Sequence, residues 1–380
     1  MDIPRNPRVL RSLLGPAWRG LVKHRGRSAG TSTVRVDLDA TFDWGYDRSF
    51  PELARLYEVA KESQWNAATA IDWSRAVEPR DPARPLLPGS FVPFASLRGW
   101  REGSPGHRAM LTHALASWLL SQFLHGEQGA LFAAAQVTEA VPWLDAKLYG
   151  STQVVDEGRH VEVFHRYLST KLEWLYEIDD NLYVVIDALM SDGRWDVKFL
   201  GMQILVEGLA LGAFGMIRRL TSDPVLRDVL KNVITDEARH VHFGVAALRR
   251  HYREGIEEPA RREREDWAFE VALLLRNRFL ARELHGEFFG HEVSRAEWDR
   301  TILASPMMGL FRETMFRRIV PNLKAIGLLS DRIRPRYERE GLLRFENEKA
   351  APDLTAEDLL AEEPAGDGSP APPGPRGRAG

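Results

Sequence analysis

The 380-residue sequence contains no cysteine. This absence excludes disulfide bonds, thiolate zinc sites, iron–sulfur clusters, thiolate haem ligation and cysteine nucleophiles. Any metal ion that the chain binds must therefore take its ligands from histidine, aspartate and glutamate.

An excess of charge of one sign is also missing. Lys and Arg number 51, Asp and Glu number 54, and the net charge is -3. This balance gives no argument for nucleic acid as the main partner, and we expect none. Hydrophobic residues make up 44% of the chain and charged residues 28%, which suffices for a large core and excludes global disorder.

The sequence shows no secretory signal peptide, because residues 1–27 are basic but lack an apolar run and a cleavage site. We therefore expect a cytoplasmic protein. Residues 199–217 form a long apolar stretch whose polar side chains are Gln203 and Glu207. A carboxylate near the middle of a single membrane span is unfavourable, so we predict a helix buried inside a helical bundle and no membrane span.

The pattern of helix signals divides the chain into three regions. We predict an irregular N-terminal arm at 1–50, a helical domain at 51–345 with a metal-binding core at 105–255, and a disordered tail at 346–380. Apolar residues recur at helical spacing, and strand signals are almost absent, so the predicted fold class is all-α. The predicted helices lie at 51–75, 105–140, 143–172, 180–190, 195–220 and 224–254, with two or three more between 258 and 345.

Two matching pentapeptides carry the chemistry. They are Asp156-Glu157-Gly158-Arg159-His160 and Asp236-Glu237-Ala238-Arg239-His240. Each contains Glu-x-x-His, and residues three apart on a helix share a face, so each motif offers one carboxylate and one imidazole to the same point.

A second pair of glutamates repeats the spacing. Glu127 and Glu207 each precede the motif glutamate by 30 residues, and all corresponding positions lie 80 residues apart. The midpoints of the two 30-residue intervals are Pro142 and Ser222, where the sequence predicts that a helix ends. The core is therefore predicted to be a duplicated helix hairpin that forms a four-helix bundle, with four carboxylates and two imidazoles at one depth.

Four carboxylates cannot all ionise in an apolar core unless cations neutralise them. Two divalent cations would do so, and oxygen ligands with one imidazole per ion suit iron or manganese. A Glu from each of two helices plus Glu-x-x-His from each of the other two is the arrangement of di-iron carboxylate bundles.

The same motifs predict residues that support the ligands. Metal-bound histidine usually donates its second N–H to a carboxylate. Asp156 and Asp236 stand beside the ligating glutamates, so we expect Asp236 to reach His160 and Asp156 to reach His240. Arg159 and Arg239 would pair with these two aspartates.

The repeated Glu-x29-Asp-Glu-x-Arg-His motif resembles the signature of the ferritin-like di-iron oxygenase and oxidase superfamily. That group includes multicomponent monooxygenase hydroxylases, ribonucleotide reductase small subunits, acyl carrier protein desaturases and arylamine N-oxygenases. The resemblance covers residues 105–255 closely. It implies that Glu127 and His160 bind one iron, that Glu207 and His240 bind the other, and that Glu157 and Glu237 bridge them.

The resemblance also implies an activity and partners. It predicts a non-haem di-iron enzyme, with O2 as co-substrate, that oxidises a small-molecule or carrier-bound organic substrate. An electron donor such as a ferredoxin or a reductase would reduce the centre, and a homodimer is the expected assembly. The basic start of the chain is either a docking site for an acidic donor or a solvated arm, and the second interpretation is preferred.

Three positions depart from individual branches of the superfamily. Phe164 stands where ribonucleotide reductase small subunits usually have a radical tyrosine. Leu211 stands where the monooxygenase hydroxylases have threonine, and Val233 replaces the third histidine of arylamine N-oxygenases. The sequence therefore resembles the superfamily as a whole rather than one of these branches.

Alternatives remain at this stage. The same ligands would serve a manganese/iron oxidase of the R2-like ligand-binding type, and a ferritin-like protein that handles iron without catalysis is a third reading. Without metal, the six residues would form a buried salt-bridge network. Four other histidines are expected to be structural (His113, His125, His165 and His242), and Gly208, Gly212 and Gly215 either make room for substrate or allow close helix packing.

Overall fold

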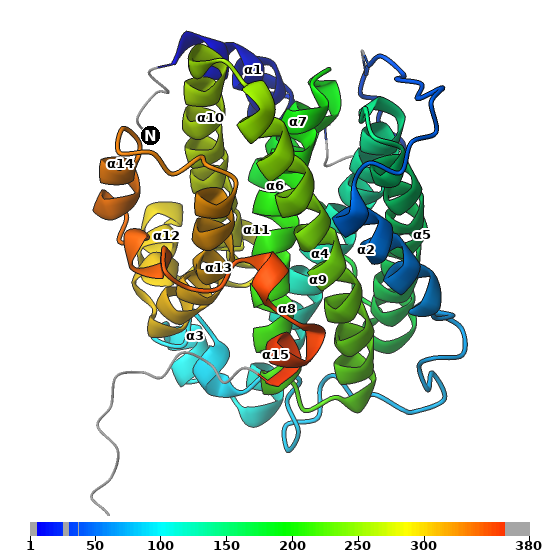
Figure 1. The fold of residues 1–380 in the computed structure, drawn as a ribbon. Coiled ribbons are helices and arrows are strands. Elements are labelled where there is room, and N and C mark those ends of the chain that lie inside the picture. Colours follow the sequence, from blue (N-terminus) through cyan, green and yellow to red (C-terminus); the bar gives the residue numbers. More distant parts are fainter. Residues whose placement is uncertain (1–5, 26–29, 37, 362–380) are drawn as a thin grey trace, which may run out of the picture.

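The computed structural model describes residues 6–25, 30–36 and 38–361. Within these ranges the regular structure is helical and no β-strand occurs, which confirms the predicted all-α class. Figure 1 shows long helices packed side by side, with shorter helices around them.

Four long helical segments form the core. The first hairpin joins α4 to α5, which continues into the π-helical turn η4, and the second joins the composite helix α7–η5–α8 to α9. Their bounds are Pro105–Ala140 (α4), Leu144–Tyr167 (α5), Leu168–Leu172 (η4), Trp195–Phe199 (α7), Leu200–Glu207 (η5), Gly208–Leu220 (α8) and Pro224–Gly255 (α9). α4 packs on α5, α9 packs on η5 and α8, and α5 packs on α9, so the two hairpins form one bundle. Helix α6 (Asp180–Ser191) lies between the hairpins in sequence, as predicted.

Local signals set the ends of these helices where the sequence places them. The Ser104 hydroxyl accepts a hydrogen bond from the His107 N–H at 3.2 Å, and Pro105 occupies the first turn, where its missing N–H costs nothing. The Asp223 carboxylate caps α9 in the same way, again ahead of a proline. The two predicted turns, near Pro142 and Ser222, each lie between the two helices of a hairpin.

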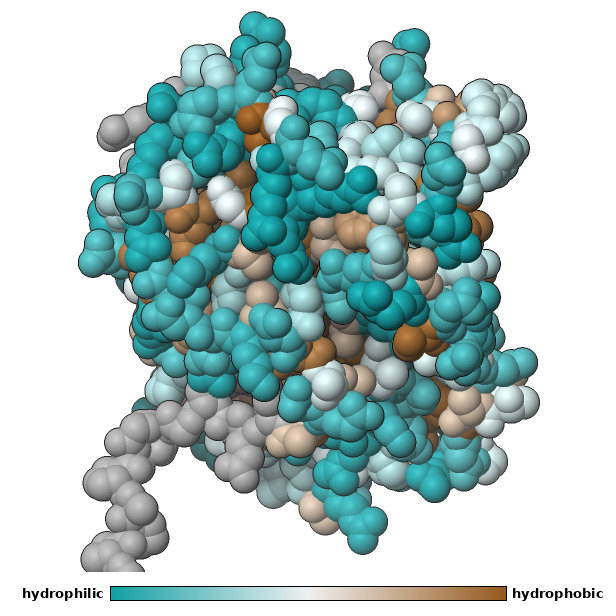
Figure 2. Space-filling view, in the orientation of Figure 1, coloured by the Kyte–Doolittle hydropathy of each residue, from teal (hydrophilic) through white to brown (hydrophobic). Residues whose placement is uncertain are grey.

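The apolar third helix of the bundle is buried. Residues Trp195–Leu220 are long and apolar enough to cross a membrane, and the most apolar window of this helix lies entirely inside the described structure. This burial confirms the prediction of an internal bundle helix. The face drawn in Figure 2 is mainly hydrophilic, with hydrophobic side chains visible in patches between polar ones.

The sequence did not predict a change of helix type within this third helix. Residues Leu200–Glu207 form the π-helix η5, in which each turn holds more residues than an α-turn and which often marks a functional site. Glu207 is its last residue. The π-helix therefore sets the direction in which Glu207 leaves the helix, and an uninterrupted α-helix would turn this carboxylate elsewhere.

Other helices surround the bundle (Figure 1). α2 packs on α5 and α9, α13 packs on α8, and α1 packs on α6 and α10. Their bounds are Pro7–Ala17 (α1), Trp18–Val22 (η1), Pro51–Glu62 (α2), Gly89–Phe91 (η3), Arg98–Arg101 (α3), Glu258–Asn277 (α10), Arg278–Leu280 (η6), Arg282–Leu284 (α11), His285–Phe289 (η7), Arg295–Ala304 (α12), Pro306–Ala325 (α13), Arg334–Arg339 (α14), Leu343–Phe345 (η8), Ala351–Asp353 (η9) and Ala356–Ala361 (α15). The helix predicted at 51–75 thus ends earlier, at Glu62.

The prediction of an irregular arm at 1–50 is wrong for residues 7–22, which form α1 and η1. Asn6 caps α1, and Pro7 stands in the first turn, where proline favours a helix start. Val9 and Leu13 are buried, and the packing of α1 on α6 and α10 outweighs the break expected at Gly15-Pro16.

The disordered tail predicted at 346–380 is wrong for residues 346–361. Residues Ala351–Asp353 and Ala356–Ala361 are helical, and Leu359 is buried. Residues 362–380 lie outside the described part of the chain. The apolar positions of 346–361 are few, so their docking on α9 depends on contacts that a local pattern does not reveal.

Gly212 offers a stability test, because α8 meets α13 there. A Cβ at Gly212 would lie 2.7 Å from the carbonyl oxygen of Thr314, which is backbone and cannot move away cheaply. We expect Gly212→Ala to lower the free energy of unfolding by about 1–3 kcal/mol in urea denaturation.

Gly215→Ala on the same helix is the control. The nearest atom to its new Cβ belongs to the flexible Arg219 side chain at 3.5 Å, so stability should hold or rise by up to about 1 kcal/mol. Equal effects at both positions would contradict the close packing of α8 on α13.

Candidate metal centre

The structure brings all six predicted ligand residues to one buried point. Glu127 comes from α4, Glu157 and His160 from α5, Glu207 from the end of η5, and Glu237 and His240 from α9. None of the six is more than 5% exposed. The duplicated hairpin therefore places the carboxylates at one depth, as the spacing predicts.

Two overlapping groups of ligand atoms can be distinguished. The first comprises Glu127, Glu157, His160 and Glu237, and the second comprises Glu157, Glu207 and His240. Within each group the donor atoms lie within 4.8 Å of one another, a spacing that allows one metal ion to be shared among them. Glu157 belongs to both groups. The cluster is thus able to hold two metal ions.

Both histidines turn Nδ1 toward the carboxylates. His160 Nδ1 lies 3.2 Å from Glu127 Oε2, 3.4 Å from Glu157 Oε2 and 3.2 Å from Glu237 Oε1. His240 Nδ1 lies 3.1 Å from Glu157 Oε1 and 3.6 Å from Glu237 Oε2. Nδ1 is therefore the atom that each imidazole offers to a metal.

The Nε2 atom of each imidazole meets an aspartate of the opposite hairpin. His160 Nε2 lies 3.2 Å from Asp236 Oδ2, and His240 Nε2 lies 3.1 Å from Asp156 Oδ2. These are the two pairings predicted from the motifs. With each aspartate accepting from Nε2–H, Nδ1 is the nitrogen that would bind a cation in exchange for any proton it carries.

The two arginines complete this crossed arrangement. Arg159 forms a short contact with Asp156 and lies 3.3 Å from Asp236, while Arg239 forms a short contact with Asp236 and lies 3.4 Å from Asp156. Each guanidinium therefore joins the aspartates of both hairpins, as predicted. Because the aspartates are neutralised by arginine, they do not add to the negative charge at the ligands.

Three further residues make contacts with the cluster or its aspartates that were not predicted. Gln153 donates through Nε2 to Glu157 Oε1 at 3.1 Å and to Glu207 Oε1 at 3.0 Å. Trp65 Nε1–H donates to Asp236 Oδ2 at 2.7 Å, and Gln64 Nε2 donates to Asp156 Oδ1 at 3.2 Å. Gln153 stands one turn before Glu157 on the same face of the helix, so the sequence does carry a signal for this contact. Trp65 and Gln64 follow α2, far from the motifs in sequence, and no local signal marks them.

Several buried ligand atoms lack a hydrogen-bond partner among the described residues. They are Glu157 Oε2, Glu207 Oε2, both carboxylate oxygens of Glu237, and His240 Nδ1. Some lie within ion-pair distance of an imidazole, but their angles do not suit a hydrogen bond. Unsatisfied polar atoms are costly in a buried site, and a bound ion is one of the usual reasons for them. These atoms therefore fit a pair of cations.

The charges of the cluster are strongly coupled. Burial raises the pKa of Glu127 to about 8, against the hydrogen bond from His160. Burial, with the charges of Glu237 and Glu157, also raises the pKa of Glu207 well above its usual range. Burial alone would lower the pKa of His160 and His240, but the surrounding carboxylates raise it. Protons on these groups offset the negative charge, and divalent cations bound by the same atoms would displace them.

A pocket adjoins the cluster between α4 and the third helix. It spans about 280 Å³, part of it open to solvent, and is lined by Gln122, Phe123, Gly126, Glu127, Ala130, Val206, Glu207, Ala210 and Glu237. Small residues make this space, because a Cβ at Gly126 would have no neighbouring atom within 4 Å. Three of the six ligand residues are thus reached from this pocket.

The other histidines stay away from the cluster. His113 Nε2 and His125 Nε2 lie 2.9 Å from the carbonyl oxygens of Leu172 and Tyr176. His242 Nε2 lies 2.9 Å from Glu52 Oε1, and His165 is exposed. The structural interpretation of these four residues agrees with these contacts.

Comparisons with known proteins gave matches to solved structures only. No protein-family model matches the chain, and no curated protein sequence does. One solved structure, a variant of R2-like ligand-binding oxidase with an anaerobically reconstituted Mn/Fe cofactor, is 20% identical, covers 76% of this chain and 97% of that chain, and has a TM-score of 0.43. Another variant, with an aerobically reconstituted Mn/Fe cofactor, is 19% identical, covers 73% and 93%, and also has a TM-score of 0.43. At these values the likeness assigns no cofactor, substrate or activity to the present chain.

Replacing Glu127 should remove one metal ion selectively. Glu127 belongs to the first group of ligand atoms and not to the second. We expect Glu127→Ala to lose about half of the metal bound by the unaltered protein, measured by elemental analysis of purified samples. Full occupancy in this variant would refute the role of Glu127 as a ligand.

The supporting aspartates should tune affinity without being ligands. Asp156→Asn removes the charge that orients His240 Nε2, and we expect metal binding to weaken about 10- to 100-fold in a chelator competition assay. Asp228→Asn, an exposed position on α9, is the control and should bind metal like the unaltered protein. Unchanged affinity in Asp156→Asn would show that the aspartate does not support the metal.

Proposed function

We propose that this chain is an O2-dependent non-haem di-iron oxidoreductase that oxidises a small organic substrate. The observation that supports this best is the convergence of four carboxylates and two imidazoles from four helices at a buried cluster. Such a cluster is costly without cations, and its donors are those that iron prefers.

In this proposal the six residues divide their roles as the sequence predicts. Glu127 and His160 bind one iron, Glu207 and His240 bind the other, and Glu157 and Glu237 bridge them. The presence of Glu157 in both groups of ligand atoms supports its bridging role. Glu237 belongs to the first group, and its Oε2 lies 3.6 Å from His240 Nδ1, which brings it near the second.

Two ferrous ions held there would supply electrons for the reduction of O2. The chain's own residues prepare the site for this chemistry. Asp156 and Asp236 fix the imidazoles, and Gln153 holds Glu157 and Glu207 together through one amide. Each held group has less freedom to leave its position, so the ligands are arranged before the metals arrive.

Three aromatic rings pack together, and one of them, Phe123, lines the pocket beside the cluster. The ring centroids of Phe123 and Phe214 are 4.7 Å apart, and those of Phe164 and Phe214 are 5.6 Å apart. All three are buried. Phe164 stands one turn after His160 and has no phenol that could hold a radical. This favours oxidation of a bound substrate over storage of a radical on the protein.

The pocket beside Glu127, Glu207 and Glu237 is where O2 and a small substrate would approach. Its lining is mostly apolar, which suits O2 and an organic molecule better than an ion. A pocket at the metals also supports catalysis over iron storage, for which no substrate space is needed. A ferredoxin or reductase as electron donor, a cytoplasmic location and a homodimer remain predictions from the sequence.

A manganese/iron centre is the alternative, because the same oxygen and nitrogen donors suit manganese. Elemental analysis after expression with iron alone, manganese alone or both separates the two. Activity that requires manganese would replace the di-iron proposal by this second one.

The main test is the reaction of the reduced protein with O2. We expect protein from iron-supplemented cells to contain about two iron ions per chain. After anaerobic reduction, it should consume O2 and change its Mössbauer spectrum from ferrous to ferric. A protein without near-stoichiometric iron or manganese, or one whose reduced form is inert to O2, would end the proposal. The Glu207→Ala variant lacks a residue of the second group only, so it should retain about half of the iron and shows whether the reaction with O2 needs both ions.

The pocket can be tested with azide, a small ligand of ferric iron. Gly126→Leu fills the space beside Glu127, and we expect azide to bind at least about tenfold more weakly, followed by visible absorption, with iron content unchanged. Gly158→Leu is the matched control, since its Cβ also meets no atom within 4 Å but it does not line this pocket. Equal azide affinity in both variants would place the open side of the metals elsewhere.

A further inference from the structure

Helix α1 and the π-helical turn η1 follow the margin of the molecule, at the top of the view in Figure 1. One side of this helix is buried against α6 and α10 through Val9, Leu13 and Gly20. A Cβ at Gly20 would lie 2.7 Å from Val184 Cγ2, which shows how closely the helix approaches α6. The buried side therefore accounts for the attachment of the helix to the bundle.

The opposite side of the helix carries a second apolar stripe, which the fold leaves exposed. It consists of Leu14, Trp18, Leu21 and Val22, and we call it the outer stripe. Separations of three and four residues place these side chains on one face, and their exposed fractions range from 37% to 58%. Thirteen large hydrophobic side chains are exposed among the described residues, and four of them fall within residues 14–22. This is a cluster rather than the single exposed residues that are usual on a protein surface.

The outer stripe lies in a strongly basic segment. Residues 3–36 contain eight Lys and Arg and no Asp or Glu. Arg8 lies 3.4 Å from Glu263, Arg19 pairs with Asp187, and the side chains of these two acids are at most 6% exposed. Both carboxylates lie beneath the helix, so they contribute little negative charge to its outer side.

Basic side chains stand at both ends of the outer stripe. Arg11 precedes most of it, Lys23 and Arg25 follow it, and all three are exposed. His24 lies 3.4 Å from Asp180, whose side chain is 15% exposed, so a carboxylate is present near the second end. The helix thus presents apolar side chains in the middle and cationic groups on either side of them.

We propose that α1 and η1 bind the surface of an anionic lipid bilayer. The outer stripe would enter the layer between the head groups and the acyl chains, and Arg11, Lys23 and Arg25 would meet the lipid phosphates. Tryptophan suits this depth, because its ring is apolar and its N–H can reach a polar head group. The segment from Pro7 to Val22 is too short to span a bilayer and is fixed to the bundle along one side, so the contact is peripheral.

A lipid surface fits this helix better than an acidic protein does. The side chains of the outer stripe project from a single helix, and a bilayer deforms around them, whereas a folded partner would need a groove that matches them. The contact uses none of the six ligand residues, and it needs neither metal nor O2. Failure of this proposal would therefore leave the proposed oxidation unaffected, and the reverse is also true.

The test is sedimentation of the full-length purified protein with lipid vesicles. We expect it to bind phosphatidylcholine vesicles that contain about 30% phosphatidylglycerol in about 0.1 M NaCl, and to bind vesicles of phosphatidylcholine alone at least about tenfold more weakly. Equal binding to both vesicles, or binding to neither, would overturn the proposal. Binding to poly-L-glutamate without binding to vesicles would overturn it in favour of an acidic protein partner.

Paired variants locate the contact. Trp18→Ser should weaken binding to the anionic vesicles at least about tenfold, because the inserted ring is lost. Trp44→Ser is the matched control, since Trp44 is 73% exposed but stands next to Asp43 outside the helix. Lys23→Gln should weaken binding about fivefold, whereas Lys61→Gln, an exposed charge on α2, should not change it. Equal behaviour within either pair would contradict the assignment to α1 and η1.

A label reports insertion directly. The chain contains no cysteine, so Val22→Cys takes a single thiol-reactive fluorophore whose emission depends on the polarity of its surroundings. We expect its emission to rise and shift to shorter wavelength when anionic vesicles are added. Val59→Cys, at an exposed position on α2, is the control and should not respond. The same response from both labels, or no response at Val22→Cys, would exclude insertion of the outer stripe.

Discussion

The repulsion among four buried carboxylates is the constraint on which the rest of the structure depends. Glu127, Glu157, Glu207 and Glu237 lie in the middle of a helical bundle, where an ionised group has little water to stabilise it. Cations bound at the cluster would relieve this repulsion, and the two imidazoles lie where they could complete the coordination. The paired aspartates and arginines behind the histidines are neutral as a set, so they position the ligands without adding charge that the metals would also have to balance.

The duplicated hairpin explains why this arrangement is nearly symmetric. Two departures from the symmetry lie beside the carboxylates. Each histidine meets the aspartate of the other hairpin, and each arginine joins both aspartates. The symmetry breaks at Gln153, whose counterpart four residues before Glu237 is the buried Val233. It breaks again at the π-helix η5, which has no counterpart in α4. A polar amide therefore holds the carboxylates on one side of the cluster, while small and aromatic residues leave a pocket on the side of α4.

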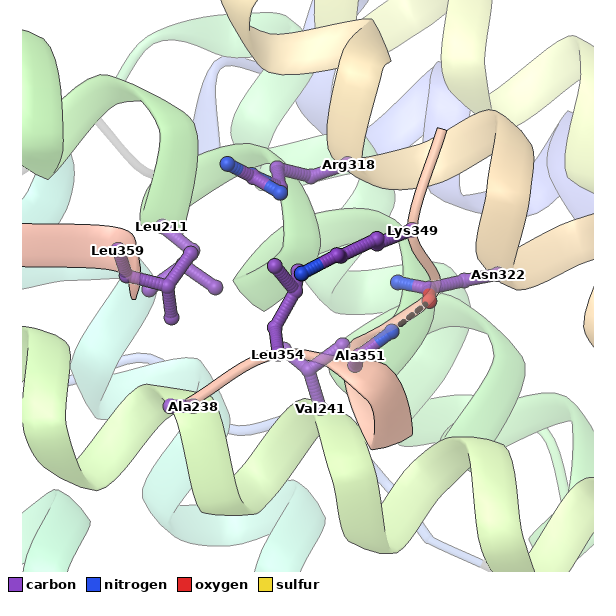
Figure 3. Close-up of a pocket in the computed structure, with 9 residues that line it drawn as sticks. All are labelled: Leu211, Ala238, Val241, Arg318, Asn322, Lys349, Ala351, Leu354 and Leu359. Carbon is purple, nitrogen blue, oxygen red and sulfur yellow. Dashed lines mark hydrogen bonds between the residues drawn. The ribbon is translucent and has the colours of Figure 1, made fainter. Parts of the chain in front are cut away.

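The segments outside the bundle make different kinds of contact with it. The segment that follows α2 brings Trp65 and Gln64 to the aspartates, so residues outside the bundle contribute to the support of the cluster. α13 and residues 349–359 instead line a separate pocket against α8 and α9 (Figure 3).

The sequence by itself determined the parts that depend on periodicity. The helix hairpins, their turns near Pro142 and Ser222, the burial of residues 195–220 and the meeting of the six ligand residues all follow from spacing along single helices, because a helix converts residue number directly into depth and direction. Tertiary structure alone decided the rest. The helix at 7–22 forms because it packs on α6 and α10. The π-helical turns before Glu207 form inside a crowded core. Trp65, Gln64 and residues 349–361 reach their partners from distant parts of the chain. Contacts of this kind depend on how helices sit against one another, and no local pattern of residues encodes that geometry.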